Sequence, residues 1–209
     1  MGDTGSPCLE DELRGFAAVA EACARALVNE PSSDVVRDVR RVARALGMTR
    51  FDRVEPGAAL RQRYYDRFFV SAGPLFAPLV ESCVRGAQVQ DGRRSFGVAG
   101  GPAADHALRC YRAVGFDYRA LEGFAPAVAQ LRPDSMACEL AFMASLARCA
   151  CEGGEDAAAA RSVELLRRFA REHAAGWFGA AAEALRRVDD DFYAGVCALA
   201  AEAADVWAQ

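Results

Sequence analysis

The segment from residue 131 to residue 146, LRPDSMACELAFMASL, constrains the fold more than any other part of the chain. Pro133 cannot continue a helix from its N-terminal side, whereas Asp134 and Ser135 can accept hydrogen bonds from free backbone N–H groups. A helix is therefore predicted to begin here. Its apolar residues form two neighbouring stripes at helical spacing: Met136, Leu140 and Met143, and Cys138, Phe142, Leu146 and Cys149. A helix that is apolar around most of its circumference is expected to lie inside the protein.

Two carboxylates lie near the start of this predicted helix. Glu139 falls in its first turns, where the helix dipole favours a negative charge but burial requires a partner. Glu139 is either a buried acceptor for a backbone or Arg donor, or a functional carboxylate. Asp134 is either a helix cap or a binding group, and the residues alone leave both pairs of alternatives open.

The rest of the chain repeats the helical spacing, and no segment shows sustained alternation of period two. The predicted helices cover residues 9–29, 34–46, 57–70, 103–114, 134–151, 163–188 and 192–207, with a short helix within 116–132. Hydrophobic residues make up 53% of the 209, which is enough for a sizeable core. The prediction is an all-α protein, a single compact domain over residues 1–209 with about eight or more helices.

Residues 71–104 interrupt this pattern, because Gly and Pro recur throughout them. Connections longer than about 15 residues tend to be functional or mobile in compact domains. We therefore expect this segment to line a site or to act as a hinge.

Composition and charge exclude several classes of function. The net charge of −4 argues against a nucleic-acid binder, although Arg is plentiful and Lys is absent. No apolar stretch approaches the roughly 20 residues of a membrane span, and the N-terminus has no basic region before an apolar run. Most of the eight cysteines fall at small-apolar positions of predicted helices. These features predict a cytoplasmic protein with reduced thiols, neither exported nor inserted in a membrane.

Motifs for catalysis or for metal binding are scarce. The chain has no nucleotide-binding glycine motif, and Cys149-Ala150-Cys151 has no partner pair at ligand spacing. His106 and His173 are far apart in sequence, and His173 is expected to pack beside Trp177 on one helix face if that helix continues. We therefore expect no enzymatic activity, no metal and no cofactor.

Three blocks of the sequence resemble a known family, in their joint order and spacing over roughly residues 60–207. They are Tyr65-Asp66-Arg67-Phe68-Phe69 with Ala77-Pro78-Leu79-Val80-Glu81-Ser82; Pro133-Asp134-Ser135-Met136-Ala137-Cys138-Glu139-Leu140-Ala141-Phe142-Met143; and Glu172-His173 with Trp177, then Phe192-Tyr193. With these blocks the chain resembles the TorD/DmsD family, the cytoplasmic chaperones for molybdenum-dependent redox enzymes. Two positions depart from the family pattern. Ser135 stands where the family usually has His, and Arg132 stands where an acidic residue commonly precedes the Pro.

The resemblance implies a TorD-like helical bundle that binds the twin-arginine signal peptide of a molybdopterin oxidoreductase's catalytic subunit. Such a chaperone holds its client back from export until the cofactor is inserted, as a monomer or as a homodimer. Two guanidinium groups beside an apolar run need carboxylates at the rim of an apolar groove. The expected carboxylates are Glu81, Asp134 and Glu139, with Ser135 beside them, and the expected groove walls are Tyr65, Phe68, Phe69, Pro78 and Pro133.

Two other functions fit the residues. The alternative function is that of a helical protein or enzyme that binds a small ligand or cofactor in an apolar pocket near Phe142 and Trp177. It also fits an adaptor whose aromatic helix 57–70 packs against another subunit.

Overall fold

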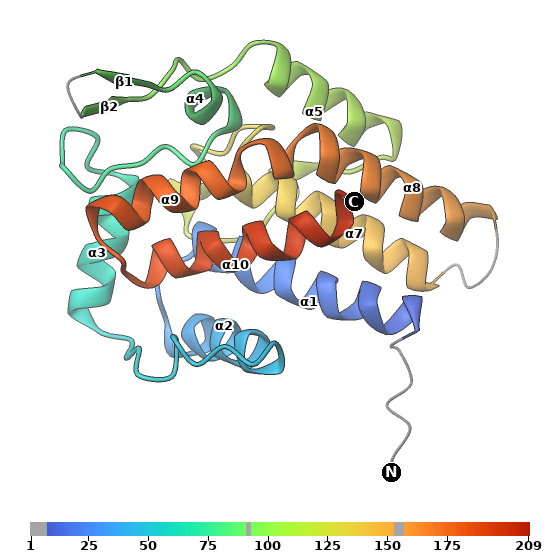
Figure 1. The fold of residues 1–209 in the computed structure, drawn as a ribbon, viewed down its shortest axis with the longest axis horizontal. Helices are drawn as coiled ribbons and strands as arrows, with labels where there is room; N and C mark the ends of the chain where they lie inside the picture. Colours follow the sequence, from blue (N-terminus) through green and yellow to red (C-terminus); the bar gives the residue numbers. More distant parts are fainter. Residues whose placement is uncertain (1–7, 91–92, 153–156) are drawn as a thin grey trace.

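The computed structural model describes residues 8–90, 93–152 and 157–209, and it is all-α, as predicted (Figure 1). The helices are α1 (Leu9–Val28), α2 (Ser33–Ala45), α3 (Ala58–Phe68), α4 (Glu81–Arg85), α5 (Pro102–Ala113), α6 (Ala125–Val128), α7 (Met136–Glu152), α8 (Ala157–Glu172), α9 (Phe178–Val188) and α10 (Phe192–Trp207). Two short 3-10 helices, η1 (Tyr118–Ala120) and η2 (Ala174–Gly176), join them. None of the described helices is long and apolar enough to cross a membrane.

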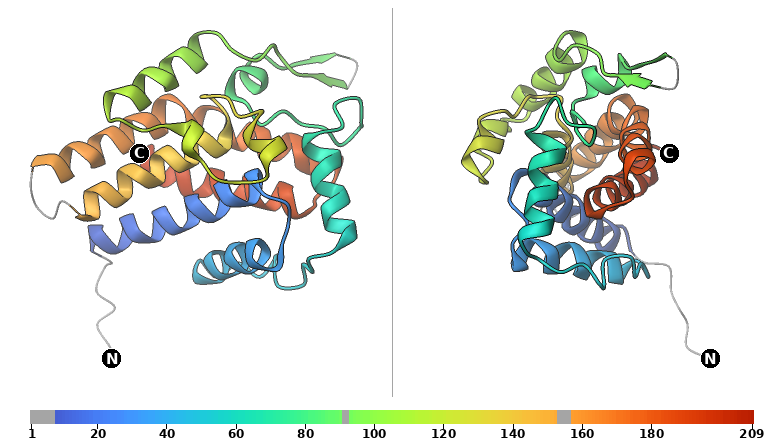
Figure 2. Two further views of the ribbon diagram at one scale, coloured as in Figure 1. Left: turned by 180° about the vertical axis from the view of Figure 1, so that it is seen from behind. Right: turned by 90° about the vertical axis from the view of Figure 1, so that its left-hand side faces the viewer.

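Helix α7, the segment that dominates the sequence, lies in the interior. It packs against α1 on one side and α8 on the other, while α10 packs against α9, α1 and α8 (Figure 1). From behind, the segment that carries η1 and α6 covers α7 (Figure 2). Residues 136–140 are all buried, so the predicted interior position of this helix is confirmed.

Local sequence signals set several helix ends. Ser32 accepts a hydrogen bond from the backbone N–H of Val35 at the start of α2, and Asp191 accepts one from Ala194 at the start of α10. Helix α2 is followed by Gly47, which has a φ of +75°. This left-handed conformation suits glycine and stops the helix.

The segment 71–104 contains more structure than its Gly and Pro content predicts. It holds α4 and a two-stranded antiparallel sheet, β1 (Gln88–Gln90) paired with β2 (Arg93–Ser95). Helix α4 packs against α5, and hydrogen bonds join it to Asp134 before α7 and to the end of α8. These tertiary contacts stabilise a helix that is too short for hydrophobic periodicity to reveal.

The predicted continuous helix over 163–188 is wrong, because the chain breaks at His173 into α8, η2 and α9. At this break the Arg85 guanidinium donates to the backbone oxygens of Glu172 and His173, at 2.9 and 3.2 Å. It also occupies the place of a side chain at Gly176, where a Cβ atom would lie 2.3 Å from Arg85 Nη2. A cation from α4 therefore binds the carbonyl end of α8, which the sequence spacing around His173 does not show.

Candidate functional site

The first two sequence blocks meet through their backbones. Val80 and Ser135 form an antiparallel bridge; the Glu81 N–H donates to the Asp134 oxygen at 2.7 Å, and the Met136 N–H donates to the Leu79 oxygen at 3.0 Å. This pairing joins the start of α4 to the start of α7, across more than fifty residues of sequence. The two blocks therefore lie side by side.

An apolar cavity of about 250 Å³ lies beside this pairing. Phe68, Phe69, Pro78 and Ser135, four of the residues predicted for the site, line it. The remaining lining residues are Leu27, Val28, Tyr64, Phe76, Ala77, Leu79, Val80, Cys83, Ala99, Ala127, Gln130, Leu131, Arg132 and Ala137. Arg132 is the single charged residue among them, so the cavity suits an apolar ligand.

Packed aromatic rings make up one wall of the cavity. The fully buried Tyr64 ring has its centroid 5.3 Å from that of Phe68 and 5.6 Å from that of Phe69, and the Phe68 ring meets Tyr193 of α10 edge-on at 5.1 Å. Aromatic rings in such tilted and edge-on contacts hold each other in place. The wall is therefore preformed by α3 and α10.

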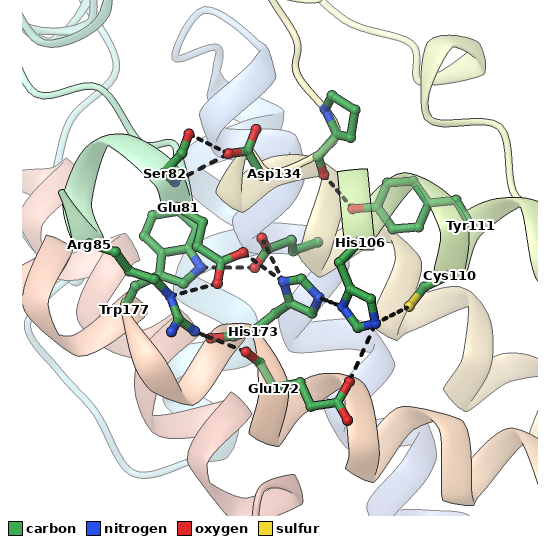
Figure 3. A network of polar contacts seen from close by, with 12 residues as sticks. Glu81, Ser82, Arg85, His106, Cys110, Tyr111, Asp134, Glu172, His173 and Trp177 are labelled. Carbon is green, nitrogen blue, oxygen red and sulfur yellow. Dashed lines mark hydrogen bonds and ion pairs between the residues drawn. The ribbon is translucent and has the colours of Figure 1, made fainter. Parts of the chain in front are cut away.

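Asp134 is fully buried and binds α4, the neighbouring element. Its Oδ2 atom accepts hydrogen bonds from the Ser82 N–H at 3.2 Å and from the Ser82 hydroxyl at 2.6 Å (Figure 3). The carbonyl of Pro133 accepts a hydrogen bond from the Tyr111 hydroxyl at 2.6 Å. Asp134 is thus a helix cap, as one alternative held, but it caps the first turn of α4 instead of its own helix.

Glu81, His173 and Glu139 are buried and form a polar network with Arg85 and Trp177. Figure 3 labels Glu81, His173, Arg85 and Trp177. His173 Nδ1 lies 2.6 Å from Glu81 Oε2 and 4.0 Å from Glu139 Oε1. Arg85 Nε lies 2.6 Å from the other oxygen of Glu81, and the Trp177 indole N–H donates to Glu139 Oε2 at 3.0 Å. The network joins α4, α7 and the ends of α8 and η2.

The surroundings of these groups set their protonation. Burial, and after it the negative charge of Glu81, raises the pKa of the Glu139 carboxyl well above its usual range. Burial by itself lowers the pKa of His173, but contacts with Cys110 and Glu81 and the charges of Glu139 and Glu81 raise it to about 10. Both raised pKa values favour the protonated form of the group concerned.

Comparison with known proteins now decides the family. The sequence model described as nitrate reductase delta subunit matches residues 29–183, which is more than half of the chain. The protein belongs to the nitrate reductase delta subunit family. The first two blocks and the 172–177 part of the third lie inside this range, whereas Phe192-Tyr193 lies outside it. The assignment confirms the resemblance to the TorD-type maturation chaperones of redox enzymes.

Two further comparisons were made, with solved structures and with curated proteins. The crystal structure of a proposed redox enzyme maturation protein from Archaeoglobus fulgidus is 17% identical, covers 95% of this chain and 94% of its own, and superposes with a TM-score of 0.49. A search of curated proteins finds no match.

The predicted position of the three carboxylates is wrong. Glu81, Asp134 and Glu139 were expected at the rim of a groove, but all three are buried and none lines the cavity. Asp134 precedes α7 and Glu139 lies in its buried first turn, and the two accept hydrogen bonds from Ser82 and Trp177 instead of facing solvent. Pro133 and Tyr65 also lie outside the cavity lining, and the Tyr65 hydroxyl donates to Glu30 at 2.6 Å.

The pocket expected near Phe142 and Trp177 is present only in part. Phe142 lines a second cavity of about 210 Å³ between α5 and α8, whereas Trp177 is buried and does not line this cavity. Its ring sits in the core, where its N–H meets Glu139. The expected shared pocket is therefore corrected to a cavity beside Phe142 alone.

Two arrangements of polar residues in this protein were not predicted from the sequence. Arg67, quoted only as part of a motif, is fully buried. His106 and His173, far apart in sequence, stack with ring centroids 5.0 Å apart. The signal for Arg67 was its position three residues after the buried Tyr64 on the inner face of α3, but no sequence spacing pairs the two histidines.

Loss of the Asp134 carboxylate is expected to destabilise this fold moderately. The substitution Asp134→Ala leaves the Ser82 N–H without its acceptor and should lower the free energy of unfolding by about 1–3 kcal/mol. Chemical denaturation measures the loss. The exposed Asp11, far from α4, is the control, and an equal effect of Asp11→Ala would contradict the capping role.

Proposed function

We propose that this protein is the dedicated chaperone of a molybdenum-dependent oxidoreductase, and that it binds the twin-arginine signal peptide of the enzyme's catalytic subunit. It assists cofactor insertion and folding before export, acts in the cytoplasm, and has no catalysis of its own. The observation that carries the proposal is the apolar cavity between two family blocks, lined by Phe68, Phe69, Pro78 and Ser135. Membership of the delta-subunit family supports it.

The cavity suits the apolar part of a signal peptide. Its walls are aromatic and aliphatic, and a leucine or phenylalanine of the peptide would bury its side chain there. Ser135 also lines the cavity, with its hydroxyl buried.

The arginine pair of the peptide needs carboxylates that solvent can reach. Glu81, Asp134 and Glu139 remain part of the proposed site, but as its supporting wall, since each is buried and has partners in the protein. Glu30 is a better partner for a guanidinium group. It follows the cavity-lining Val28 by two residues, its side chain is 37% exposed, and Tyr65 fixes its carboxylate by a hydrogen bond.

Peptide binding is expected to depend on Phe69. The probe is the synthetic leader of a molybdoenzyme from the same genome, carrying the Arg-Arg pair and the apolar run, and isothermal titration calorimetry measures its affinity. The half-buried Phe69 lines the cavity, so Phe69→Ala should weaken binding about tenfold or more, which is about 1.4 kcal/mol. Glu30→Gln should reduce the salt dependence of binding.

The matched control is Phe116→Ala, which removes another half-buried aromatic ring outside this cavity. It should leave the affinity unchanged. Equal losses from Phe69→Ala and Phe116→Ala would place binding elsewhere, and no binding of the leader to the wild-type protein would reject the proposed function.

A further inference from the structure

Three potential metal ligands meet where α5 lies beside the end of α8. His106 and Cys110 lie one turn apart on α5, and His173 follows α8 (Figure 3). His106 Nδ1 is 2.8 Å from His173 Nε2, and Cys110 Sγ is 3.9 Å from His106 Nε2. The ligand atoms of these three residues all lie within 4.8 Å of one another. A metal ion with bonds of about 2.0–2.3 Å fits between them after small side-chain rotations.

The protein orients His173 in the way metal-binding proteins orient their histidine ligands. Its Nδ1 faces the buried Glu81 carboxylate at 2.6 Å, and Arg85 holds that carboxylate from the other side. This turns Nε2 towards His106 and Cys110. A carboxylate behind a histidine fixes the ring and makes its other nitrogen a better ligand. Glu172 Oε2 lies 3.8 Å from His106 Nε2, so a second carboxylate stands beside the pair.

The cluster is open to solvent on one side. His106, Cys110 and Glu172 line the cavity of about 210 Å³ beside Phe142, and the His106 side chain is 31% exposed. An ion can enter there, and Glu172 or a water can complete four-coordination. The other triad of potential ligands among the described residues, Glu81, Glu139 and His173, is buried throughout, and Arg85 and Trp177 already bind its carboxylates.

We propose that His106, Cys110 and His173 bind a zinc ion. Two imidazoles and one thiolate are a donor set that Zn²⁺ favours over harder ions such as Mg²⁺ and Ca²⁺. Binding would replace the proton that the two ring nitrogens share, and that proton and the Cys110 thiol proton would pass to solvent. The ion would tie α5 to the end of α8. The proposed zinc site does not depend on peptide binding. It departs from the prediction, based on sequence spacing, that the protein binds no metal.

The test uses the full-length protein, stripped of metal with a chelator and then titrated with Zn²⁺ or Co²⁺. We expect one Zn²⁺ per chain after desalting, by elemental analysis, and a rise in the melting temperature. Co²⁺ should give a thiolate-to-metal charge-transfer band together with the visible bands of tetrahedral cobalt. Cys110→Ser should abolish the charge-transfer band, and His106→Gln should weaken Zn²⁺ binding at least tenfold.

Because the chain has eight cysteines, the control is the exposed Cys149, which lies beside Cys151 on α7. Cys149→Ser should leave the band and the stoichiometry unchanged. Both positions are partly exposed, so we expect Cys110→Ser and His106→Gln to fold, and circular dichroism checks this. Absence of stoichiometric binding, or a charge-transfer band that survives Cys110→Ser, would overturn the proposal.

Discussion

Replacing Arg67 by alanine is expected to lower the free energy of unfolding by about 3–5 kcal/mol, the largest of the effects predicted for this protein. The Arg67 side chain is fully buried, and its Nε donates to Asp191 Oδ2 at 2.8 Å. Its Nη1 and Nη2 donate to the backbone oxygens of Leu75, Leu185 and Asp189, at 3.1, 3.3 and 2.7 Å. One guanidinium group thus joins α3 to the end of α9 and the start of α10. Its loss leaves three backbone oxygens without this donor and leaves the nearly buried Asp191 carboxylate with only the longer ion-pair contact to Arg63, at 3.7 Å.

Urea denaturation of two further variants tests this role. Arg67→Lys should restore only part of the stability, because the compact lysine ammonium has fewer N–H donors than the guanidinium group and cannot reach all four acceptors. Arg61→Ala is the control on the same helix, since the Arg61 side chain is 60% exposed and pairs only weakly with Glu30. It should change the free energy of unfolding by less than about 1 kcal/mol. Comparable losses from Arg61→Ala and Arg67→Ala would contradict the structural role of Arg67.

The second large effect is expected at Glu81 and not at its neighbour Glu139. Glu81→Gln removes the negative charge between His173 and Arg85, so a buried imidazole loses its anionic partner. We expect a loss of about 3 kcal/mol, since a buried charge without its partner is costly. Glu139→Gln should cost less than about 1 kcal/mol. Burial and the nearby charge of Glu81 raise the pKa of Glu139, so a neutral amide resembles the native protonated acid and still accepts from Trp177.

Thermal and chemical denaturation at neutral pH compare the two variants. Both glutamates are buried and both substitutions keep the side-chain shape, so each serves as the control for the other. A Glu139→Gln loss as large as that of Glu81→Gln would show that Glu139 is ionised in the folded protein, contrary to the protonation inferred for the network.

The helices could be predicted because their signals are local. Ser32 and Asp191 cap the helices that directly follow them, and the apolar circumference of α7 places it in the interior. The break at His173 could not be predicted in this way. Apolar spacing runs through it unchanged, and the carbonyls at the break are bound by Arg85, a side chain about 87 residues earlier in the sequence.

The site could be predicted in its walls but not in its charges. Phe68, Phe69 and Pro78 are apolar, and an apolar residue in a family block lines a cavity without needing a specific partner. Asp134 and Glu139 do need partners, and these come from Ser82 and Trp177, which lie 52 and 38 residues away in sequence. The donor that a buried carboxylate binds depends on the tertiary contacts, which the sequence pattern does not show. The pattern therefore predicted these carboxylates at the rim of the groove, whereas in the structure they are buried.

The most direct measurement of peptide binding in the cavity is photo-crosslinking with a signal peptide. The peptide carries the arginine pair and, within its apolar run, a photoreactive leucine analogue, and mass spectrometry maps the adducts. Adducts are expected on the segments that line the cavity, around Phe69, Pro78 and Leu131, and they should disappear when unlabelled peptide competes. Adducts confined to α2 or to the exposed face of α8, with none on the cavity segments, would contradict peptide binding between the two family blocks.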